Sequence, residues 1–413
     1  MRRRTVLGLG TAAVPAALLA PNPASAHDGR RWMHTWVSMP QLTEPGNLPP
    51  APFTGTSSVL VDTTLRQTVH VTVAGSRLRV RFSNAFGGAA LPLTSAAVAL
   101  PAGGKAGVSA IVPESSRPLT FGGRSSVVVP VGANVVSDPV DLPVSSGANL
   151  TITTYLASGQ ASLNLTSHPG SRTTTYLVNG NFVLSPDLSG AATVAHWYLI
   201  SGVEVLGDAP AIAIVGDSLT DGRGSTTDGN DRWPDQLFAR RPRIAVLNQA
   251  AGGNRVLNDG LGPNVLARLD RDVLATSGVD RMMIFEGVND IGTAAATETA
   301  QKQVTDDLLF AFEQVVLRAH ARDITAYGAT ITPFGGNTGY DDPDGLRERS
   351  RQAVNTVIRR GRLFDEFADF DIAARDPADP RRLNPAYDVG DHLHLNPTGY
   401  GALAAAVPLR WLS

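Results

Sequence analysis

The chain has 413 residues, of which 43% are hydrophobic and 17% charged, a composition typical of a globular protein of about two domains. Its formal net charge of −2 gives no electrostatic attraction to nucleic acid or to an anionic membrane, so we expect neither as a partner. It contains no cysteine, which excludes disulfides, cysteine-based zinc sites and cysteine nucleophiles.

The amino terminus has the features of an export signal. Arginines at positions 2–4 precede an apolar stretch over residues 6–20, and small residues at 24–26 suit a cleavage site. The order Arg-Arg-x-Val-Leu is typical of a twin-arginine signal, with an ordinary secretory signal as the alternative. We therefore expect residues 1–26 to be a signal peptide and the protein to be secreted. The apolar stretch is too short to span a bilayer and no other segment is longer, so we expect no stable membrane anchoring.

Residues 32–206 have the pattern of an all-β domain. Residues 77–82 alternate polar and apolar side chains, as a half-buried strand does. Short runs rich in Val, Thr, Leu and Ile also lie at residues 68–73, 126–130 and 149–156, with Gly, Pro, Ser and Asn between them. Many short strands separated by turn residues predict a β-sandwich that resembles a jelly roll.

The pattern changes near Pro210, where we place the domain boundary. Apolar side chains recur every three or four positions over residues 304–319 and again over 346–358, which predicts two helices. Helical segments of this kind alternate with five apolar runs at residues 211–215, 244–247, 281–285, 324–331 and 363–367. The alternation predicts an α/β domain over residues 210–413, with a parallel sheet covered on both faces.

Four segments of this second domain carry polar residues at positions that suit chemistry. Three follow predicted strands and the fourth precedes the last helix; they are residues 216–218, 248–255, 286–291 and 391–394. Because the carboxyl ends of parallel strands meet at one edge of a sheet, we expect the segments to converge there. Together they offer a serine nucleophile, oxyanion donors and a histidine oriented by an aspartate. This set predicts acyl transfer through a covalent intermediate.

In this order, the four segments resemble the four blocks of the GDSL, or SGNH, hydrolase superfamily. Ser218 in Gly-Asp-Ser-Leu matches the nucleophile, and Asp391 and His394 match the Asp-x-x-His pair that supplies the base. The resemblance covers about residue 211 to the carboxyl terminus and implies a flavodoxin-like, three-layer fold for this domain. The Gly-x-Ser-x-Gly elbow of α/β-hydrolases is absent, because Thr220 stands where its second glycine would be.

The resemblance also implies an oxyanion hole. Asn289 in Gly-Val-Asn-Asp matches the asparagine whose side-chain amide donates to the oxyanion, and the backbone N–H of Ser218 is a second donor. Gly253 matches the glycine donor in the block that Asn248 opens, with Gly252 as the alternative if the register shifts by one. The resemblance implies no cofactor and no metal.

Several polar residues near these blocks have open interpretations. Glu286 follows a predicted strand and is interpreted either as a buried hydrogen-bonding partner or as a substrate contact. His392 lies beside the predicted base without a match in the family, and we interpret it as non-catalytic. Asp341, Asp342 and Asp344 could bind calcium, but they lack the spacing of an EF-hand loop and are interpreted as a turn that opens a helix.

Two further patterns are interpreted as structural. The arginine-rich residues 347–351 and 359–362 are predicted to be solvated helix faces. Trp36 and Trp197 could stack on a sugar, but we favour a place in the core of the first domain. Residues 83–87 and 168–174 resemble phrases of secreted actinobacterial hydrolases of this superfamily with an added β-domain, which could wall the active-site cleft.

We therefore predict a secreted serine esterase that acts on an ester substrate, with an acetylated polysaccharide such as xylan as the first hypothesis. The predicted export and the two domains motivate the polysaccharide. A lipase or arylesterase is the alternative within enzymes, and a non-catalytic carbohydrate-binding protein on a hydrolase scaffold is the alternative of another class. The oligomeric state is not readable from the sequence.

Overall fold

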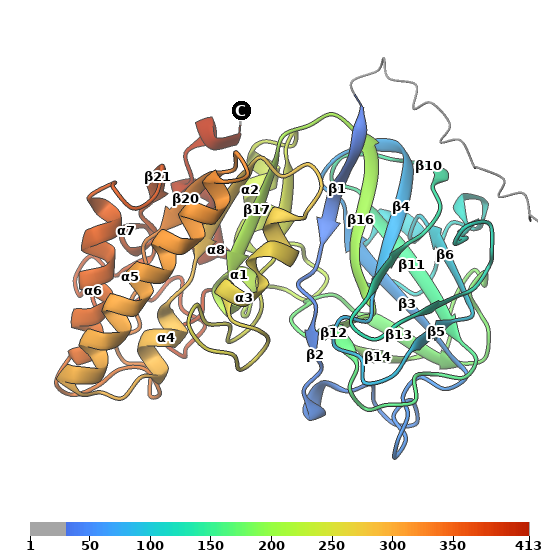
Figure 1. The fold of residues 1–413 in the computed structure, drawn as a ribbon, viewed down its shortest axis with the longest axis horizontal. Coiled ribbons are helices and arrows are strands. Elements are labelled where there is room, and N and C mark those ends of the chain that lie inside the picture. The colour runs from blue at the N-terminus through green and yellow to red at the C-terminus, as the bar shows by residue number, and fades with distance from the viewer. Residues whose placement is uncertain (1–29, 413) are drawn as a thin grey trace, which may run out of the picture. The chain divides into compact units, whose positions relative to one another are not determined.

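The computed structural model describes residues 30–412, and residues 31–412 lie in one compact unit (Figure 1). Secondary structure changes from antiparallel strands to alternating strands and helices between Gly207, which ends β16, and Ala211, which begins β17. We call residues 31–207 the β region and residues 211–412 the α/β region. The predicted signal peptide, residues 1–26, lies outside the described residues. Among residues 30–412, no helix combines the length and the apolarity that a membrane span requires.

The β region consists of antiparallel strands, as predicted. One sheet has the order β1-β16-β4-β10, with β9 also paired to β4, and comprises β1 (Arg31–Val37), β16 (Ile200–Gly207), β4 (Gly75–Ser83), β10 (Val140–Val144) and β9 (Asn134–Val136). The second has the order β14-β13-β3-β11-β6-β7 and comprises β14 (Ala192–Val194), β13 (Thr175–Asn179), β3 (Thr63–His70), β11 (Asn149–Leu156), β6 (Ser95–Ala99) and β7 (Arg117–Pro118). Smaller sheets join β2 (Gln41–Leu42), β12 (Thr166–His168) and β15 (Trp197–Tyr198), and β5 (Leu91–Leu93) with β8 (Val127–Val129).

The two large antiparallel sheets enclose a common core, which makes this region a sandwich. Strand β4 shows why the alternating pattern predicted a half-buried strand: Leu78, Val80 and Phe82 are fully buried, whereas Arg79 and Arg81 between them are partly exposed. Side chains of the other sheet, including Leu150 of β11, belong to the same hydrophobic cluster. Burial of one face of each sheet therefore defines the register of both.

The α/β region contains a five-stranded parallel sheet of order β18-β17-β19-β20-β21. Its strands are β17 (Ala211–Gly216), β18 (Ala245–Asn248), β19 (Arg281–Phe285), β20 (Thr325–Ala329) and β21 (Glu366–Ala368). In chain order this is 2-1-3-4-5, the order of flavodoxin-like folds, in which ligands bind where the strand order reverses. All residues of β17 are buried, so both faces of the sheet are covered. The predicted flavodoxin-like α/β fold is confirmed.

The helices of this region form two groups of mutual contacts. Helices α3 (Val265–Leu269), α4 (Val288–Thr293), α5 (Glu298–His320) and α6 (Leu346–Arg359) make up one group, and α2 (Trp233–Arg240), α7 (Phe370–Ala374) and α8 (Pro397–Ala406) the other. A short helix, α1 (Ser218–Asp221), follows β17, a π-turn (Asp270–Leu274) follows α3, and a 3-10 turn (Leu409–Leu412) ends the described chain. The periodic residues 304–319 lie within α5, as predicted.

Two predicted strands are shorter in the structure. Residues 324–331 contain β20 only over Thr325–Ala329, and residues 363–367 contain the beginning of β21, which starts at Glu366. Leu363 and Phe364 are apolar because they are buried in a turn: the Phe364 ring lies over Gly328 and contacts Phe312 of α5. Apolar residues that are buried but not paired in the sheet explain why the predicted strands were longer than the observed ones.

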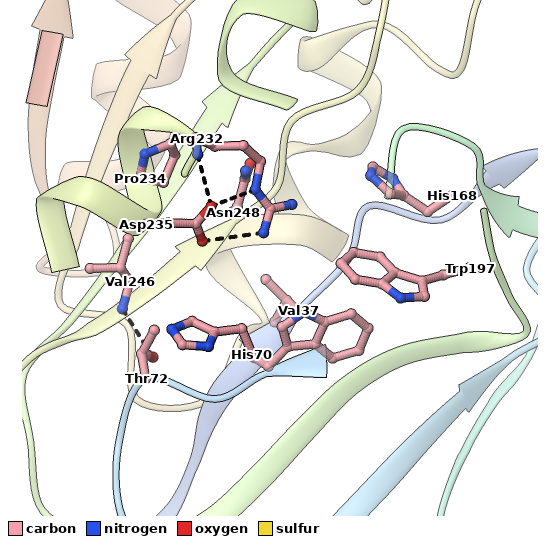
Figure 2. Close-up of a pocket in the computed structure, with 11 residues that line it drawn as sticks. Val37, His70, Thr72, His168, Trp197, Arg232, Pro234, Asp235, Val246 and Asn248 are labelled. Carbon is pink, nitrogen blue, oxygen red and sulfur yellow. Dashed lines mark hydrogen bonds and ion pairs between the residues drawn. The ribbon is translucent and has the colours of Figure 1, made fainter. Parts of the chain in front are cut away.

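The β region covers the edge of the parallel sheet. Strand β1 contacts β18, the edge strand, and Ala245 and Leu247 of β18 belong to the hydrophobic cluster of the β region. The backbone N–H of Val246 donates to the Thr72 hydroxyl at 3.3 Å (Figure 2). An edge strand with unpaired N–H groups would otherwise be open to pairing with another chain. The two regions are therefore packed together through a shared core.

Candidate active site

The nucleophile candidate lies at the carboxyl end of the central strand β17. The strand ends at Gly216, where an added Cβ atom would lie 2.3 Å from the hydroxyl of Thr220, so no side chain fits there. Asp217 caps α1 by accepting the backbone N–H of Leu219 at 2.9 Å. Ser218 is the first residue of the helix and is 7% exposed. This turn presents the Ser218 hydroxyl at the sheet edge.

The histidine and aspartate candidates reach this hydroxyl from a segment just before α8. Ser218 Oγ lies 2.8 Å from His394 Nε2, and His394 Nδ1 lies 2.6 Å from Asp391 Oδ2. The other Asp391 oxygen accepts the backbone N–H groups of Leu393 and His394, at 3.0 and 2.8 Å. Since an ionised carboxylate only accepts, Nδ1 carries the ring proton and Nε2 is free to accept the proton of Ser218. The structure therefore brings the three predicted residues into one hydrogen-bonded chain.

The pKa values of this pair suit a base that works near neutral pH. Burial lowers the pKa of His394 below its ordinary value of 6.5, although Asp391 acts in the opposite direction. Burial acts to raise the pKa of Asp391, but hydrogen bonds from the backbone and ring of His394 outweigh it and lower that pKa. At neutral pH the imidazole is thus neutral and the carboxylate is ionised.

The glycine-rich turn after β18 contributes the next candidates. Gly252 donates its backbone N–H to Asp221 Oδ2 at 2.9 Å, so this N–H is occupied. Within residues 30–412, the backbone N–H groups of Gly253 and Ser218 have no protein acceptor. Gly253 has a positive φ of 70°, which explains why a glycine stands there. The geometry favours Gly253 over the alternative Gly252 as a donor to a ligand.

Asn289 approaches the same place from the first turn of α4. Its Oδ1 accepts the hydroxyl proton of Tyr340 at 2.6 Å, and its Nδ2 donates to the backbone carbonyl of Asn254 at 2.8 Å. These two bonds fix the amide orientation and leave one Nδ2 hydrogen without a protein acceptor. Asp290 next to it accepts the N–H groups of Val256 and Leu257, at 2.9 and 3.0 Å, and so holds the glycine-rich turn against α4.

These side chains line a cavity of about 450 Å³. Ser218, Gly253, Asn289 and His394 all contribute to its wall, so the structure places every predicted member except Asp391 on one surface, with Asp391 held behind His394. Apolar side chains from the α/β region also contribute, among them Leu261, Tyr340 and Leu393. The rest of the wall comes mainly from the β region and is mostly polar there; these residues are Gln41, Glu44, Asn47, Pro169, Gly170, Arg172, Ala195 and His196. The β region therefore forms part of the candidate site.

A group of buried carboxyl groups surrounds Asp217, the residue before Ser218. Burial raises the pKa of Asp217 to about 7, and the neighbouring Asp290 and Asp221 act in the same direction. Burial also raises the pKa of Glu286 well above 4.5. Glu286 is 2% exposed and does not line the cavity, and its nearest cation is Arg268 at 3.8 Å. This position disfavours a substrate contact and leaves the interpretation of Glu286 as a buried polar partner, with the Gly287 N–H beside it.

The structure places the remaining candidates outside the cavity wall. His392 pairs with Asp388 at 2.7 Å and does not line the cavity. Asp342 accepts the backbone N–H groups of Leu346 and Arg347, both at 2.9 Å, and so opens α6 as a cap. In the described part of the chain, no group of three or more His, Asp or Glu side chains is arranged to hold a metal ion.

The aspartates at 341 and 344 make local contacts of the same kind. Asp341 accepts the N–H of Gly336 at 2.7 Å, and the Asp344 carbonyl accepts from Arg349.

Trp36 and Trp197 are 5% and 3% exposed and pack edge to face with ring centres 4.9 Å apart. They are core residues, as we favoured, and neither offers a face to a sugar.

One interpretation was wrong. We expected residues 347–351 to be a solvated helix face, but Arg351 is fully buried and bonds Asp371 at 2.8 Å and Glu348 at 2.7 Å. The buried face of α6 also contains Leu346, Ser350, Val354, Asn355 and Ile358, and Arg351 lies within that stripe. The helical period alone places position 351 on the buried face. The charge of Arg351 is tolerated there because two carboxylates compensate it.

Sequence reasoning missed several residues that shape the cavity. Tyr340, which orients Asn289, lies in a loop with no motif. Asp221 and His168 stood within recognised phrases but had no assigned role; in the structure they are 2.8 Å apart and join the two regions. No sequence motif could have revealed this pair, because the two residues come from different regions of the chain.

A sequence model of the GDSL-like Lipase/Acylhydrolase family matches residues 214–402. No curated protein matches the chain by sequence. Among solved structures, the chain is similar to an acetylxylan esterase from Geobacillus stearothermophilus, with 21% identity over 50% of this chain and 95% of the other and a TM-score of 0.37. A GDSL-like lipase from Bacteroides thetaiotaomicron shares 17% identity over 48% and 84% of the two chains, with a TM-score of 0.36. An alpha/beta hydrolase enzyme from the metagenome of Lake Arreo, Spain, shares 20% over 48% and 94%, with a TM-score of 0.35.

Proposed function

We propose that residues 214–402, which match the sequence model of the GDSL-like Lipase/Acylhydrolase family, form a serine esterase that works through an acyl-enzyme. The observation that carries the proposal is the hydrogen-bonded chain from Ser218 Oγ through His394 to Asp391, with spacings of 2.8 and 2.6 Å. A serine hydroxyl is a weak nucleophile unless a base is within hydrogen-bonding reach and is itself oriented.

The reaction has two halves. His394 Nε2 accepts the proton of Ser218 while Oγ forms a bond to the ester carbonyl carbon, and the carbonyl oxygen becomes an oxyanion. His394 then gives this proton to the leaving alkoxide, the carbon–oxygen ester bond breaks, and the acyl group stays on Ser218. In the second half, water loses a proton to His394 and attacks the acyl-enzyme, and the same proton returns to Ser218 as the acid leaves.

Three donors surround the position of the oxyanion: the backbone N–H groups of Ser218 and Gly253 and the free Nδ2 hydrogen of Asn289. None of the three has another acceptor among the described residues, and all three residues line one cavity. Such preorganised donors stabilise developing charge without reorganisation. Asp391 keeps the imidazole in the required tautomer and stabilises its protonated form.

We propose a small acyl group on a polar alcohol, such as an acetylated polysaccharide. The part of the cavity wall that comes from the β region is mostly polar, and the side-chain amides of Gln41 and Asn47 both donate to the Glu44 carboxylate there. Hydroxyl groups of a sugar are suitable partners for such side chains. Export through the twin-arginine route, the expectation from residues 2–7, would bring the enzyme to extracellular polymers.

The test compares wild type, Ser218→Ala and Ser225→Ala on nitrophenyl esters of increasing chain length and on acetylated xylan. Ser225 is a matched control, because it is 4% exposed and close in sequence, yet its hydroxyl has no hydrogen-bond partner among described residues. We expect Ser218→Ala to lower kcat by about 10⁴-fold or more, with Ser225→Ala close to wild type.

A serine-reactive organophosphate provides a second readout. It should label wild type and Ser225→Ala but not Ser218→Ala. Equal labelling of Ser218→Ala, or no labelling of wild type, contradicts the nucleophile assignment. Strong activity on long acyl chains without acetate release from xylan contradicts the polysaccharide and favours a lipase.

A further inference from the structure

His168 lies where the β region meets the α/β region. It ends β12, is 4% exposed, and its ring stacks on Trp197 with centres 5.8 Å apart. The two rings line a small cavity of about 20 Å³. Figure 2 shows Arg232 and Asp235 of the α/β region across from them. Because buried polar groups are almost always hydrogen-bonded, we expect both ring nitrogens of His168 to have partners.

Both ring nitrogens of His168 face oxygen atoms. Nδ1 lies 3.0 Å from the Met39 carbonyl, and Nε2 lies 2.8 Å from Asp221 Oδ1. A carbonyl can only accept, so Nδ1 carries a hydrogen. Nε2 in turn makes a hydrogen bond with the Asp221 carboxyl group. Both ring nitrogens are therefore engaged, which fixes the ring between the two regions.

Asp221 also contacts the glycine-rich turn, which contains the oxyanion candidate Gly253. Its Oδ2 accepts the backbone N–H of Gly252 at 2.9 Å, and Gly253, the oxyanion candidate, is the next residue. Asp221 also lies on α1, one turn after Ser218, where Gly222 N–H donates to the Ser218 carbonyl at 2.9 Å. One carboxylate thus contacts the β region, the nucleophile helix and the glycine-rich turn.

The backbone after His168 is packed against the same carboxylate. An added Cβ atom on Gly170 would lie 1.7 Å from Asp221 Oδ2, so this position admits no side chain. The segment 168–170 leaves Asp221 little freedom to move. The close approach explains why a glycine follows His-Pro in this loop.

We infer that His168 is a positioning residue for the proposed esterase reaction: through Asp221 it holds Gly252, and thereby directs the Gly253 N–H toward the oxyanion formed at Ser218. This inference rests on the proposed function. The reacting groups all come from the α/β region, whereas His168, which positions the Gly253 N–H, comes from the β region. The inference therefore makes the β region part of the catalytic apparatus. A displacement of about 1 Å in a donor is sufficient to weaken transition-state binding.

The experiment uses the full chain, four single variants and one double variant with nitrophenyl acetate as substrate. His168→Phe keeps a ring against Trp197 but removes both hydrogen bonds, and Asp221→Ala removes the link itself. His70→Phe is the matched control: His70 lines the same small cavity and contacts Asn149 and Phe238, with no contact to Asp221 or the glycine-rich turn. Asp221→Asn is the conservative variant, because its amide can accept from Gly252 and donate to a neutral His168.

We expect His168→Phe and Asp221→Ala to lower kcat by about 10- to 100-fold with KM changed less than about threefold, since a displaced oxyanion donor acts on the transition state. Asp221→Asn should recover kcat to within about threefold of wild type, because its hydrogen bonds are retained without the charge. The double variant His168→Phe/Asp221→Ala should be no slower than Asp221→Ala, as expected for residues that act through each other. Inhibition by phenylboronic acid, which forms a tetrahedral adduct, should weaken by the same factor as kcat/KM falls.

The inference is overturned if His168→Phe keeps wild-type kcat, if His70→Phe loses as much, or if the two single losses multiply in the double variant. It is equally overturned if KM rises while boronate inhibition stays unchanged. Circular dichroism and thermal melting of each variant show that the folded protein is compared. A wild type without esterase activity would refute the proposed function itself, which separates the two failures.

Discussion

The α/β region and the β region contribute to the same cavity by different routes. In the α/β region, Ser218, Gly253 and Asn289 each follow a parallel strand, so the order of the strands brings them together. In the β region, the residues of the cavity wall come from β2 and from loops, and their places depend on how the sandwich packs against β18. The candidate reacting groups are therefore positioned by sheet topology, and the β-region part of the cavity wall by packing between the two regions.

The regions also differ in what their polar residues contact. The α/β region buries Asp217, Glu286 and Asp290, whose pKa values are all raised by burial. On the β side, the Glu44 carboxylate accepts hydrogen bonds from Gln41 and Asn47, two other polar residues of the wall. This difference suggests that replacements in the α/β region should change kcat, and replacements in the wall should change substrate choice.

The largest effect in this comparison is expected for Asn289→Ala, which removes an oxyanion donor from the α/β region. We expect kcat for nitrophenyl acetate to fall by about 10²- to 10³-fold with little change in KM, because the amide acts on the transition state. Steady-state kinetics on the purified variant measures both. An unchanged kcat would show that Asn289 serves only the contact with Asn254.

A smaller loss is expected for Tyr340→Phe. Its hydroxyl donates to Asn289 Oδ1 at 2.6 Å and so determines which way the amide faces. Removing one hydrogen bond should lower kcat by about tenfold, and the change should vanish in the Asn289→Ala background, where no amide remains to orient. Independent losses in the double variant would contradict this coupling.

The β-side wall is tested by Glu44→Ala. We expect kcat/KM for acetylated xylan to fall by about three- to tenfold, through KM, since a hydrogen-bonding group for the alcohol is lost and Gln41 and Asn47 are freed. Hydrolysis of nitrophenyl acetate, which has no sugar, should change by less than about twofold. Equal losses on both substrates would show that the wall supports the fold instead of selecting the substrate.

The smallest effect concerns stability and pH. The folded pKa of Asp217 is about 7, above its ordinary value of 3.8, so between these values the native state binds a proton that the unfolded state has released. Stability from this group is therefore complete below pH 3.8 and is lost as pH rises through about 7. Asp217→Asn keeps the cap on Leu219 and should reduce the fall in Tm between pH 5 and pH 8. Glu286, whose pKa is also raised, leaves part of the slope. A steeper fall in the variant would contradict this sign.

The sequence by itself predicted which groups are the candidates to react. A serine after a buried strand, a glycine-rich turn, an asparagine and an Asp-x-x-His pair identify a site at one edge of a parallel sheet, because strand ends in such a sheet converge. Repeated short strands identified the sandwich, since alternation at Leu78, Val80 and Phe82 reflects burial of one face. Each of these signals is a pattern among neighbouring residues, so it can be read directly from the sequence.

Only the tertiary structure decided what surrounds and supports those groups. The contact of His168 with Asp221, the hydroxyl of Tyr340 on Asn289 and the burial of Arg351 between carboxylates each join residues from separate elements. A single hydrogen bond between distant segments leaves no periodic pattern in either segment. Its existence depends on the packing of whole sheets and helices, which no short motif records.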